Sequence, residues 1–179
     1  LLVVDNGSIY TKQLTDFLSE KNISFEKYTP YILELNSLQK YDSIILSGRR
    51  KNDKKINEVN SKIINFSINN SKKLLGICYG AEILALTLGG TIRKTKSIQK
   101  GNEHIEILQN NLITKNSINV FESHAFEISK LPNMLTTIGK SNNCKYEIIQ
   151  HEEKLIFGTQ FHPEMSPDGN NLIENFCSL

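Results

Sequence analysis

Three side chains suited to nucleophilic chemistry stand in two short motifs of this sequence. Residues 76–80 read Gly-Ile-Cys-Tyr-Gly around Cys78, and residues 160–164 read Gln-Phe-His-Pro-Glu with His162 and Glu164. A cysteine can attack as a nucleophile, and a histidine can take the thiol proton and later return it to a leaving amine. A glutamate can fix the orientation and tautomer of that histidine. The two motifs together predict a Cys-His-Glu site.

The residues around Cys78 predict a sharp turn from a buried strand into a helix. An apolar run opens at residue 74, and apolar residues at helical spacing follow from residue 83. Gly76 and Gly80 supply small residues where the backbones crowd. The thiol would then project from the carboxyl edge of a sheet, near a helix N-terminus that favours the thiolate. The other interpretation of Cys78 alone is a buried, inert cysteine.

The motif with His162 follows an apolar strand signal at residues 155–157. In an extended segment, residues two apart share a face, so His162 and Glu164 can both face the mouth of the site. A satisfied histidine beside a surface glutamate is the alternative for this motif alone. Both motifs, each after an apolar strand, are much less expected by chance.

Composition indicates one soluble globular domain over residues 1–179. Hydrophobic residues make up 39% and charged residues 22% of the chain, and the formal net charge is +2, which is too small to indicate nucleic acid or a membrane surface as a partner. The three cysteines, Cys78, Cys144 and Cys177, are far apart, which fits a reduced cytoplasmic setting and neither a disulfide framework nor a zinc site.

Alternating strand and helix signals predict an α/β fold, with a parallel sheet covered on both faces in the first half. After residue 90, shorter alternating strands predict an antiparallel region. The expected strands are 1–5, 23–28, 43–46, the one that opens at residue 74 and leads into Cys78, 91–93, 104–108, 118–121, 135–138, 146–149 and 155–157. The expected helices are 8–20 (capped by Ser8), 53–69, the one after Cys78, and 169–176, with a turn or short helix at 33–38.

The two motifs and their order resemble the class I (triad) glutamine amidotransferases. The opening residues 2–7 and the segment 123–132, which begins Ser-His, look most like the glutaminase part of GMP synthase. The resemblance implies a three-layer sandwich with a mostly parallel central sheet flanked by helices. It also implies hydrolysis of L-glutamine to glutamate and ammonia through a γ-glutamyl thioester on Cys78, without metal or organic cofactor. A separate ATP-dependent synthetase subunit that aminates XMP would receive the ammonia.

The resemblance also implies an oxyanion hole of backbone N–H groups. One donor would be Tyr79, directly after the nucleophile, and the other would come from the loop at Gly48 and Arg49. The family usually has a second glycine and then proline where this chain has Arg49 and Arg50. Because a Cβ restricts the peptide flip that glycine allows, we expect the hole to form only in an activated state or to be built differently. For Arg50, a solvated loop charge is the favoured interpretation.

Substrate binding is expected at Gly48, Glu82 and His124. Glu82 stands where the family has a glutamine that holds the substrate, and it could accept a hydrogen bond from the substrate ammonium. A helix-dipole role is equally plausible for Glu82. His124 is either an interface residue or the bridge of a turn, and Phe126 replaces an acidic residue of the family pattern.

Other functions remain open from the sequence alone. Within enzymes, the rivals are another triad amidotransferase, such as an anthranilate synthase component, or a γ-glutamyl peptidase. From a different class, the rival is a regulatory module that keeps the fold but has lost efficient catalysis.

Overall fold

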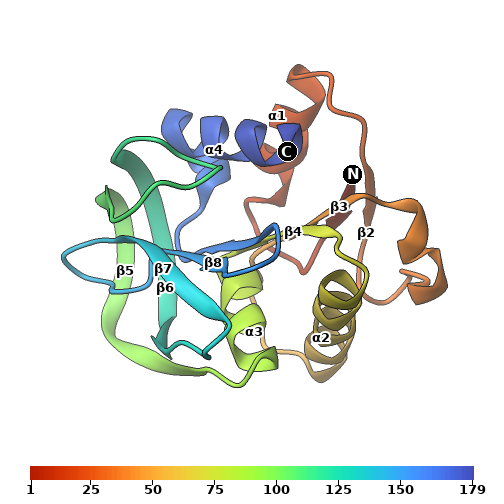
Figure 1. The fold of residues 1–179 in the computed structure, drawn as a ribbon, viewed down its shortest axis with the longest axis horizontal. Coiled ribbons are helices and arrows are strands. Elements are labelled where there is room, and N and C mark those ends of the chain that lie inside the picture. The colour runs from red at the N-terminus through yellow and green to blue at the C-terminus, as the bar shows by residue number, and fades with distance from the viewer.

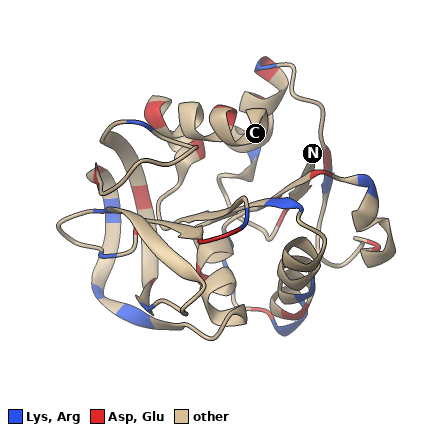
Figure 2. Ribbon diagram, in the orientation of Figure 1, with Lys and Arg blue, Asp and Glu red and all other residues tan.

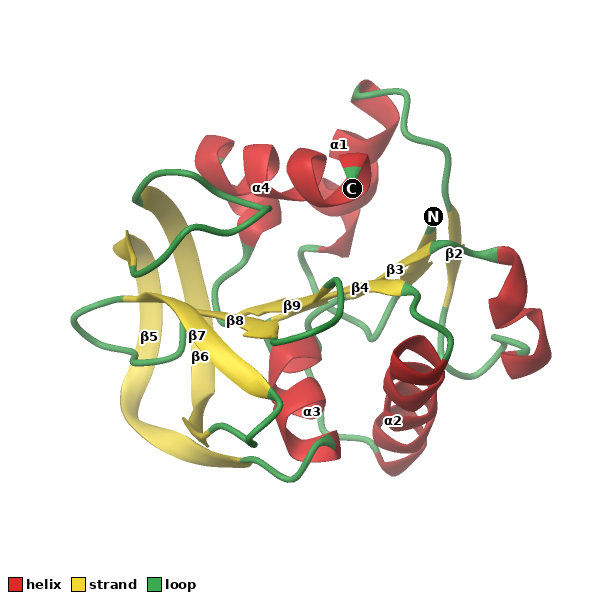
Figure 3. Ribbon diagram, in the orientation of Figure 1, coloured by secondary structure: helices red, strands yellow, loops and turns green.

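The computed structural model describes residues 1–179 as one curled mixed sheet with helices against both of its faces (Figures 1 and 3). The strand order is β2-β1-β3-β4-β9-β8-β7-β5-β6. The strands are β1 (Leu2–Val4), β2 (Glu26–Tyr28), β3 (Ser43–Leu46), β4 (Lys73–Ile77), β5 (Thr91–Ile107), β6 (Ile118–Lys130), β7 (Leu135–Lys140), β8 (Ile148–His151) and β9 (Ile156–Thr159). The helices are α1 (Thr11–Glu20), α2 (Lys54–Asn69), α3 (Tyr79–Thr87) and α4 (Pro167–Ser178), with 3-10 turns η1 (Leu35–Lys40) and η2 (Pro163–Met165).

Parallel pairing joins β2, β1, β3, β4 and β9, and antiparallel pairing joins the other strands from β9 to β6. The expected α/β class and its antiparallel C-terminal region are therefore confirmed. The sheet is mixed, because the antiparallel part contributes as many strand pairings as the parallel part.

Two apolar cores lie on opposite faces of the parallel half. Successive side chains of a strand point to opposite faces. Val3, Ile45 and Leu75 therefore pack with α1 and α4, and the neighbouring residues of each strand pack with α2 and α3. Figure 1 shows α1 and α4 on one side of the sheet and α2 and α3 on the other. This double cover holds the strand ends rigidly, which is what a site at their carboxyl edge requires.

Side-chain caps start two of the helices. The Asp53 carboxylate accepts a hydrogen bond from the Ile56 N–H at 3.0 Å, and the Ser166 hydroxyl accepts one from the Gly169 N–H at 3.2 Å. The predicted cap at Ser8 is wrong. Its hydroxyl accepts from the Tyr10 N–H at 3.1 Å, and helix α1 begins later, at Thr11.

The largest error of the sequence prediction lies in the antiparallel half. Segments 91–93 and 104–107 belong to one long strand, β5, which ends one residue before the expected end at 108, and the strand expected at 118–121 extends to Lys130 as β6. These strands form a ribbon that arches away from the core (Figure 1), so most side chains of β5 are at least partly solvated and show no apolar alternation. None of the helices combines the length and the apolar character that crossing a bilayer requires.

Candidate active site

Cys78 occupies a strained elbow between β4 and α3. Its backbone has φ 51° and ψ −104°, a conformation that side-chain-bearing residues seldom adopt. The Cys78 N–H donates to the Thr159 carbonyl at 2.7 Å, which ties the elbow to the end of β9. The strand-to-helix turn predicted from the sequence is thus confirmed.

The two glycines of the elbow are required by close backbone approach. A Cβ on Gly76 would lie 2.5 Å from the carbonyl of Gly80, and a Cβ on Gly80 would lie 2.5 Å from the carbonyl oxygen of Leu46. Neither distance is possible for real atoms, so only glycine lets α3 start directly above β3 and β4. This confirms the crowding inferred from the sequence.

The electrostatics of Cys78 differ from the sequence prediction. Burial raises the pKa of the Cys78 thiol well above its ordinary value, and the charges of Glu82, Glu122 and Glu164 raise it further. A hydrogen bond from the Tyr79 backbone N–H acts in the opposite direction but is outweighed. The resting group is therefore the thiol, because burial and three carboxylates oppose the helix N-terminus. A base must remove its proton during attack.

His162 and Glu164 form a fixed pair at the neighbouring strand end. The His162 Nδ1 lies 2.9 Å from the Glu164 Oε1, and both residues are buried. Since a carboxylate only accepts, Nδ1 donates and Nε2 carries the free lone pair. The contact is made within the turn η2, not along the extended segment that the sequence indicated. The Tyr10 ring packs edge-on against the imidazole, with centroids 4.6 Å apart.

Parallel pairing brings these groups to one edge of the sheet. Ile77 pairs with Thr159 in the register of β4 and β9, so Cys78 and His162 follow the ends of adjacent strands. Gly48 follows the end of β3 at the same edge, and a Cβ there would lie 2.9 Å from the His162 Cε1. The topology thus groups the predicted nucleophile, base and loop glycine.

Two adjoining hollows open at this edge. A cavity of about 260 Å³ is lined by Cys78, Tyr79, Glu82, His124 and Phe126 among others, and one of about 340 Å³ is lined by His162 and the loop 8–10. Arg49, Arg50 and Ser123 border both. The two cavities are therefore lined by every predicted site residue except Glu164 and Gly48. Glu164 lies behind His162, and Gly48 lies against its ring.

Arg49 has a role that the sequence did not reveal. Its guanidinium stacks over the Tyr79 ring, with Cζ 3.8 Å from the centroid, and its Nη1 donates to the Asn57 Oδ1 at 2.5 Å. The Tyr79 hydroxyl donates to the same oxygen at 2.8 Å. These contacts anchor the loop after β3 to α2 and α3, whereas a glycine there would leave it free. Arg50 is exposed, in agreement with a solvated charge.

Glu82 is a buried acid inside the cavity that contains Cys78. Burial raises the pKa of Glu82, although a hydrogen bond from Gln160 and the charge of Arg49 oppose the rise. The Gln160 Nε2 lies 3.3 Å from the Glu82 Oε1 and 3.2 Å from the Phe126 carbonyl oxygen. Gln160 was not selected from the sequence, although it stands two residues before His162.

His124 lines the same cavity but directs both ring nitrogens into the protein. Nδ1 lies 2.8 Å from the Phe126 carbonyl oxygen, and Nε2 lies 2.9 Å from the Glu122 Oε2. Neither ring nitrogen of His124 is therefore free to contact a substrate, as its predicted role in substrate binding would require. His124 shapes the wall of the cavity instead.

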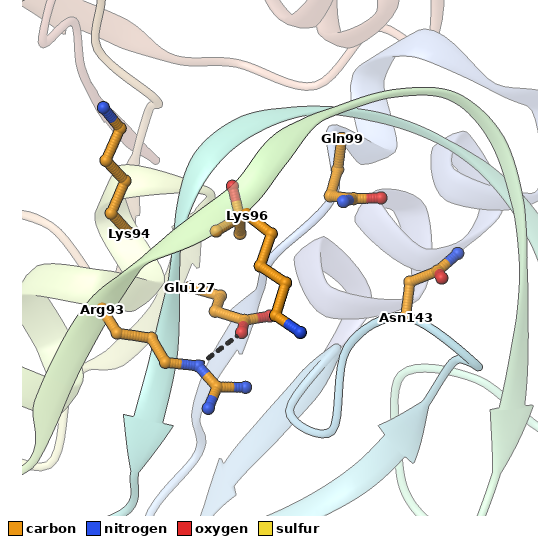
Figure 4. A pocket seen from close by; sticks show the side chains of 7 residues that line it. Arg93, Lys94, Lys96, Gln99, Glu127 and Asn143 are labelled. Atoms are coloured by element: carbon orange, nitrogen blue, oxygen red, sulfur yellow. Dashed lines mark hydrogen bonds and ion pairs between the residues drawn. The ribbon is translucent and has the colours of Figure 1, made fainter.

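A larger hollow lies away from these residues, under the β5–β6 ribbon. Its volume is about 430 Å³ and it is lined only by polar side chains, including Arg93, Lys94 and Lys96 from β5 (Figure 4). Figure 2 shows the Lys and Arg residues of this strand in blue, and the sequence of β5 adds one more, Lys100. The Arg93 Nε donates to the buried Glu127 at 2.7 Å. The hollow contains no nucleophile or base of the Cys-His-Glu site. No group of three or more His, Cys, Asp or Glu side chains is arranged to hold a metal ion.

The fold and this edge define a class of protein. Residues 2–178 match the family model described as glutamine amidotransferase class-I, and the chain belongs to that family. It is 28% identical over 186 residues to a glutamine-hydrolyzing GMP synthase subunit of Methanocaldococcus jannaschii, covering 100% of this chain and 96% of that protein. It is 33% identical over 188 residues to the glutamine-hydrolyzing GMP synthase of Helicobacter pylori, of which it covers 36%.

Solved structures agree with the family. A crystal structure described as a GMP synthase subunit from Thermoplasma acidophilum superimposes with a TM-score of 0.87 and 27% identity, covering 99% of this chain and 91% of that one. A glutamine amidotransferase from Thermotoga maritima has a TM-score of 0.79, 22% identity, and coverage of 97% and 80%, and so supports the fold alone.

Proposed function

We propose that residues 1–179 form a single glutaminase domain, a three-layer sandwich that hydrolyses L-glutamine to L-glutamate and ammonia. The observation that carries the proposal is the pair of adjoining strand ends, where Cys78 stands on a strained elbow beside a histidine oriented by Glu164. We further propose that the ammonia passes to a separate ATP-dependent synthetase subunit that aminates XMP, as the GMP synthase relatives suggest.

The first half-reaction starts from the protonated thiol. His162 takes the Cys78 proton at Nε2 while sulfur attacks the side-chain carboxamide carbon of glutamine. The resulting oxyanion accepts hydrogen bonds from backbone N–H groups, for which Tyr79 and the Gly48–Arg49 loop are the candidates. Collapse of this intermediate breaks the C–N bond, and His162 gives the proton to the departing nitrogen. Ammonia leaves, and a γ-glutamyl thioester remains on Cys78.

Water completes the cycle. His162 takes a proton from water as the oxygen attacks the thioester carbon, and the same N–H donors hold the second oxyanion. Collapse releases glutamate and returns the proton to the sulfur. Glu164 accepts from Nδ1 throughout, so it stabilises the imidazolium formed in each half-reaction.

The cavity suits the zwitterionic end of an amino acid. Glu82 can accept hydrogen bonds from the substrate α-ammonium, and Arg49, Arg50 and Lys51 border the same space and can pair with the α-carboxylate. A buried carboxylate so near the thiol also raises the energy of the thiolate. The charge of Glu82 therefore aids recognition and slows attack until substrate is bound.

Partner docking offers a means of activation. Phe126 is 45% exposed at the edge of the cavity, and Ile9, at 61% exposed, borders the neighbouring hollow. A synthetase that covers these residues would press on the loop held by Arg49 and aim its N–H inward. One oxyanion donor is worth about 10²–10³-fold in rate, so activation of that order is expected.

A catalytically weakened module of the same fold is the second candidate. The raised pKa of Cys78 and the acid at Glu82 are the observations that favour it. The deciding experiment is steady-state glutamine hydrolysis by the purified chain, alone and with a co-purifying synthetase, ATP and XMP, with His162→Ala as the inactive control.

Turnover that rises with the partner and is lost in His162→Ala supports the proposal. A free chain already at the activated rate contradicts the gating by the Arg49 loop. No turnover under any condition, with Cys78 inert to a glutamine-like electrophile, favours the weakened module.

A further inference from the structure

Two carboxyl groups lie buried side by side behind the cavity wall. Glu122 on β6 is 4% exposed, and Glu147, just before β8, is 1% exposed. Their side chains lie close enough for the charge of Glu122 to act on Glu147. Both oxygens of Glu122 and the Oε2 of Glu147 are buried, and none of the three takes part in a hydrogen bond of regular geometry. Two neighbouring buried carboxylates repel each other unless a proton lies between them, so we expect one of the two to be protonated.

His124 continues this pair toward the cavity. A carbonyl oxygen only accepts, so the Nδ1 that lies 2.8 Å from the Phe126 oxygen must carry a proton. The opposite nitrogen, Nε2, lies 2.9 Å from the Glu122 Oε2 and also needs a proton between the two atoms. With one proton in each gap, every unsatisfied atom of Glu122, Glu147 and His124 gains a partner.

We propose that Glu147, Glu122 and His124 form a buried proton-sharing chain that positions the wall of the substrate cavity. Glu147 is the carboxylic acid and donates to Glu122. Glu122 is the carboxylate and accepts from both sides. His124 is the imidazolium, and its Nδ1–H holds the Phe126 carbonyl in place. The three groups then carry no net charge, which is what burial at this depth demands.

The surroundings of the outer two members favour these protonation states. Burial, together with the charge of Glu122, raises the pKa of Glu147 well above its ordinary value. Burial opposes the charge on His124, but the hydrogen bond to Glu122 and its charge outweigh that effect and raise the pKa of His124. The remaining charged neighbours, Glu82 and Glu103, act in the same directions.

The proton-sharing chain is linked to the substrate cavity through one shared hydrogen-bond acceptor. The Phe126 carbonyl that His124 holds also accepts from the Gln160 Nε2, which in turn contacts Glu82 in the cavity. The backbone of Glu147 is also linked to Gln160, since the Gln160 N–H donates to the Glu147 carbonyl oxygen at 2.8 Å. These are positioning residues, because neither carboxyl of the chain lines the cavity.

The test follows the protons directly by NMR. Glutamate labelled at the side-chain carboxyl carbon reports whether Glu147 is protonated, and the ring carbon signals report the titration of His124. The variants are Glu147→Gln and Glu122→Gln, with the exposed Glu106→Gln on β5 as the matched control. We expect one glutamate signal of a protonated acid at neutral pH, lost in Glu147→Gln, and a His124 midpoint that falls by about one unit or more in Glu122→Gln, as loss of one charged hydrogen bond implies.

Kinetics supply the second readout, and this arm alone rests on the proposed glutaminase function. Glu122→Gln should raise the KM for glutamine about tenfold, with a smaller change in kcat, since it loosens the cavity wall without touching the reacting atoms. The absence of a protonated glutamate at neutral pH, or an unchanged His124 midpoint in Glu122→Gln, contradicts the proposed proton-sharing chain. If Glu122→Gln does not fold, the glutamate signal and its loss in Glu147→Gln decide alone. If the protein proves to have no glutaminase activity, both NMR results still decide the proposal.

Discussion

A single methyl group at Gly48 should displace the proposed base. In Gly48→Ala, the new Cβ would lie 2.9 Å from the His162 Cε1 and 3.4 Å from the Ser8 Oγ. Ordinary contact begins near 3.4 Å, so the ring must retreat by about 0.5 Å. The ring cannot do so freely, because Glu164 holds Nδ1 at 2.9 Å and Tyr10 packs against its side.

The size of the effect follows from this displacement. A misplacement of about 1 Å at a reacting centre costs roughly 10²-fold in rate, so about half of it should lower kcat for glutamine hydrolysis about tenfold. The KM should change less, since Glu82 lies in the other hollow. Ring NMR signals of His162 should shift in the variant, which would show that the base has moved.

The assay is steady-state ammonia release, normalised to folded protein by circular dichroism. The control is Ile63→Val, a fully buried change in α2 far from the edge of the sheet. It should cost about 0.5–1.5 kcal/mol of stability and leave kcat unchanged. A Gly48→Ala variant with kcat within about twofold of the parent, or an equal loss in Ile63→Val, would refute the inference that a side chain at position 48 displaces His162.

Three further outcomes are expected. Cys78→Ala should abolish both hydrolysis and labelling by a glutamine-like electrophile, whereas Cys144→Ala and Cys177→Ala should keep both; mass spectrometry that finds equal labelling of all three cysteines would contradict the nucleophile. Glu164→Gln should lower kcat by less than the roughly 10²–10⁴-fold that loss of the base itself costs, because glutamine still accepts from Nδ1; a loss as large as that would make Glu164 more than an orienting group. Glu147→Gln should gain stability relative to the parent as pH rises from 5 to 9: because the pKa of Glu147 is raised in the folded parent, the folded state keeps a proton that the unfolded chain loses near pH 4.5, so the stability of the parent falls as pH rises above that value. Urea unfolding at pH 5, 7 and 9 measures this, and a difference independent of pH would speak against a protonated Glu147.

The amino-acid sequence was enough to locate the elbow, the order of the Cys and His-x-Glu motifs, and the parallel half of the fold. These features depend on local chemistry. The crowding of Gly76 and Gly80 is set by one strand-to-helix turn, and the pairing of His162 with Glu164 spans two residues. Periodic apolar residues likewise located β1, β3, α2 and α3, because each of these elements buries a whole face.

The protonation states and the walls of the site depend on the tertiary structure. The thiol of Cys78 was expected to be activated by its helix, yet burial raises its pKa, and the charges of Glu82 in the same helix and of Glu122 and Glu164 from two other segments raise it further. The stack of Arg49 on Tyr79 likewise joins residues that no spacing rule connects. The full length of β5 and β6 was also not predicted from the sequence, since a solvated ribbon is held by backbone hydrogen bonds, which leave no apolar pattern in the sequence. Burial and charge at a site are sums over segments far apart in the chain, and the fold alone fixes which segments meet.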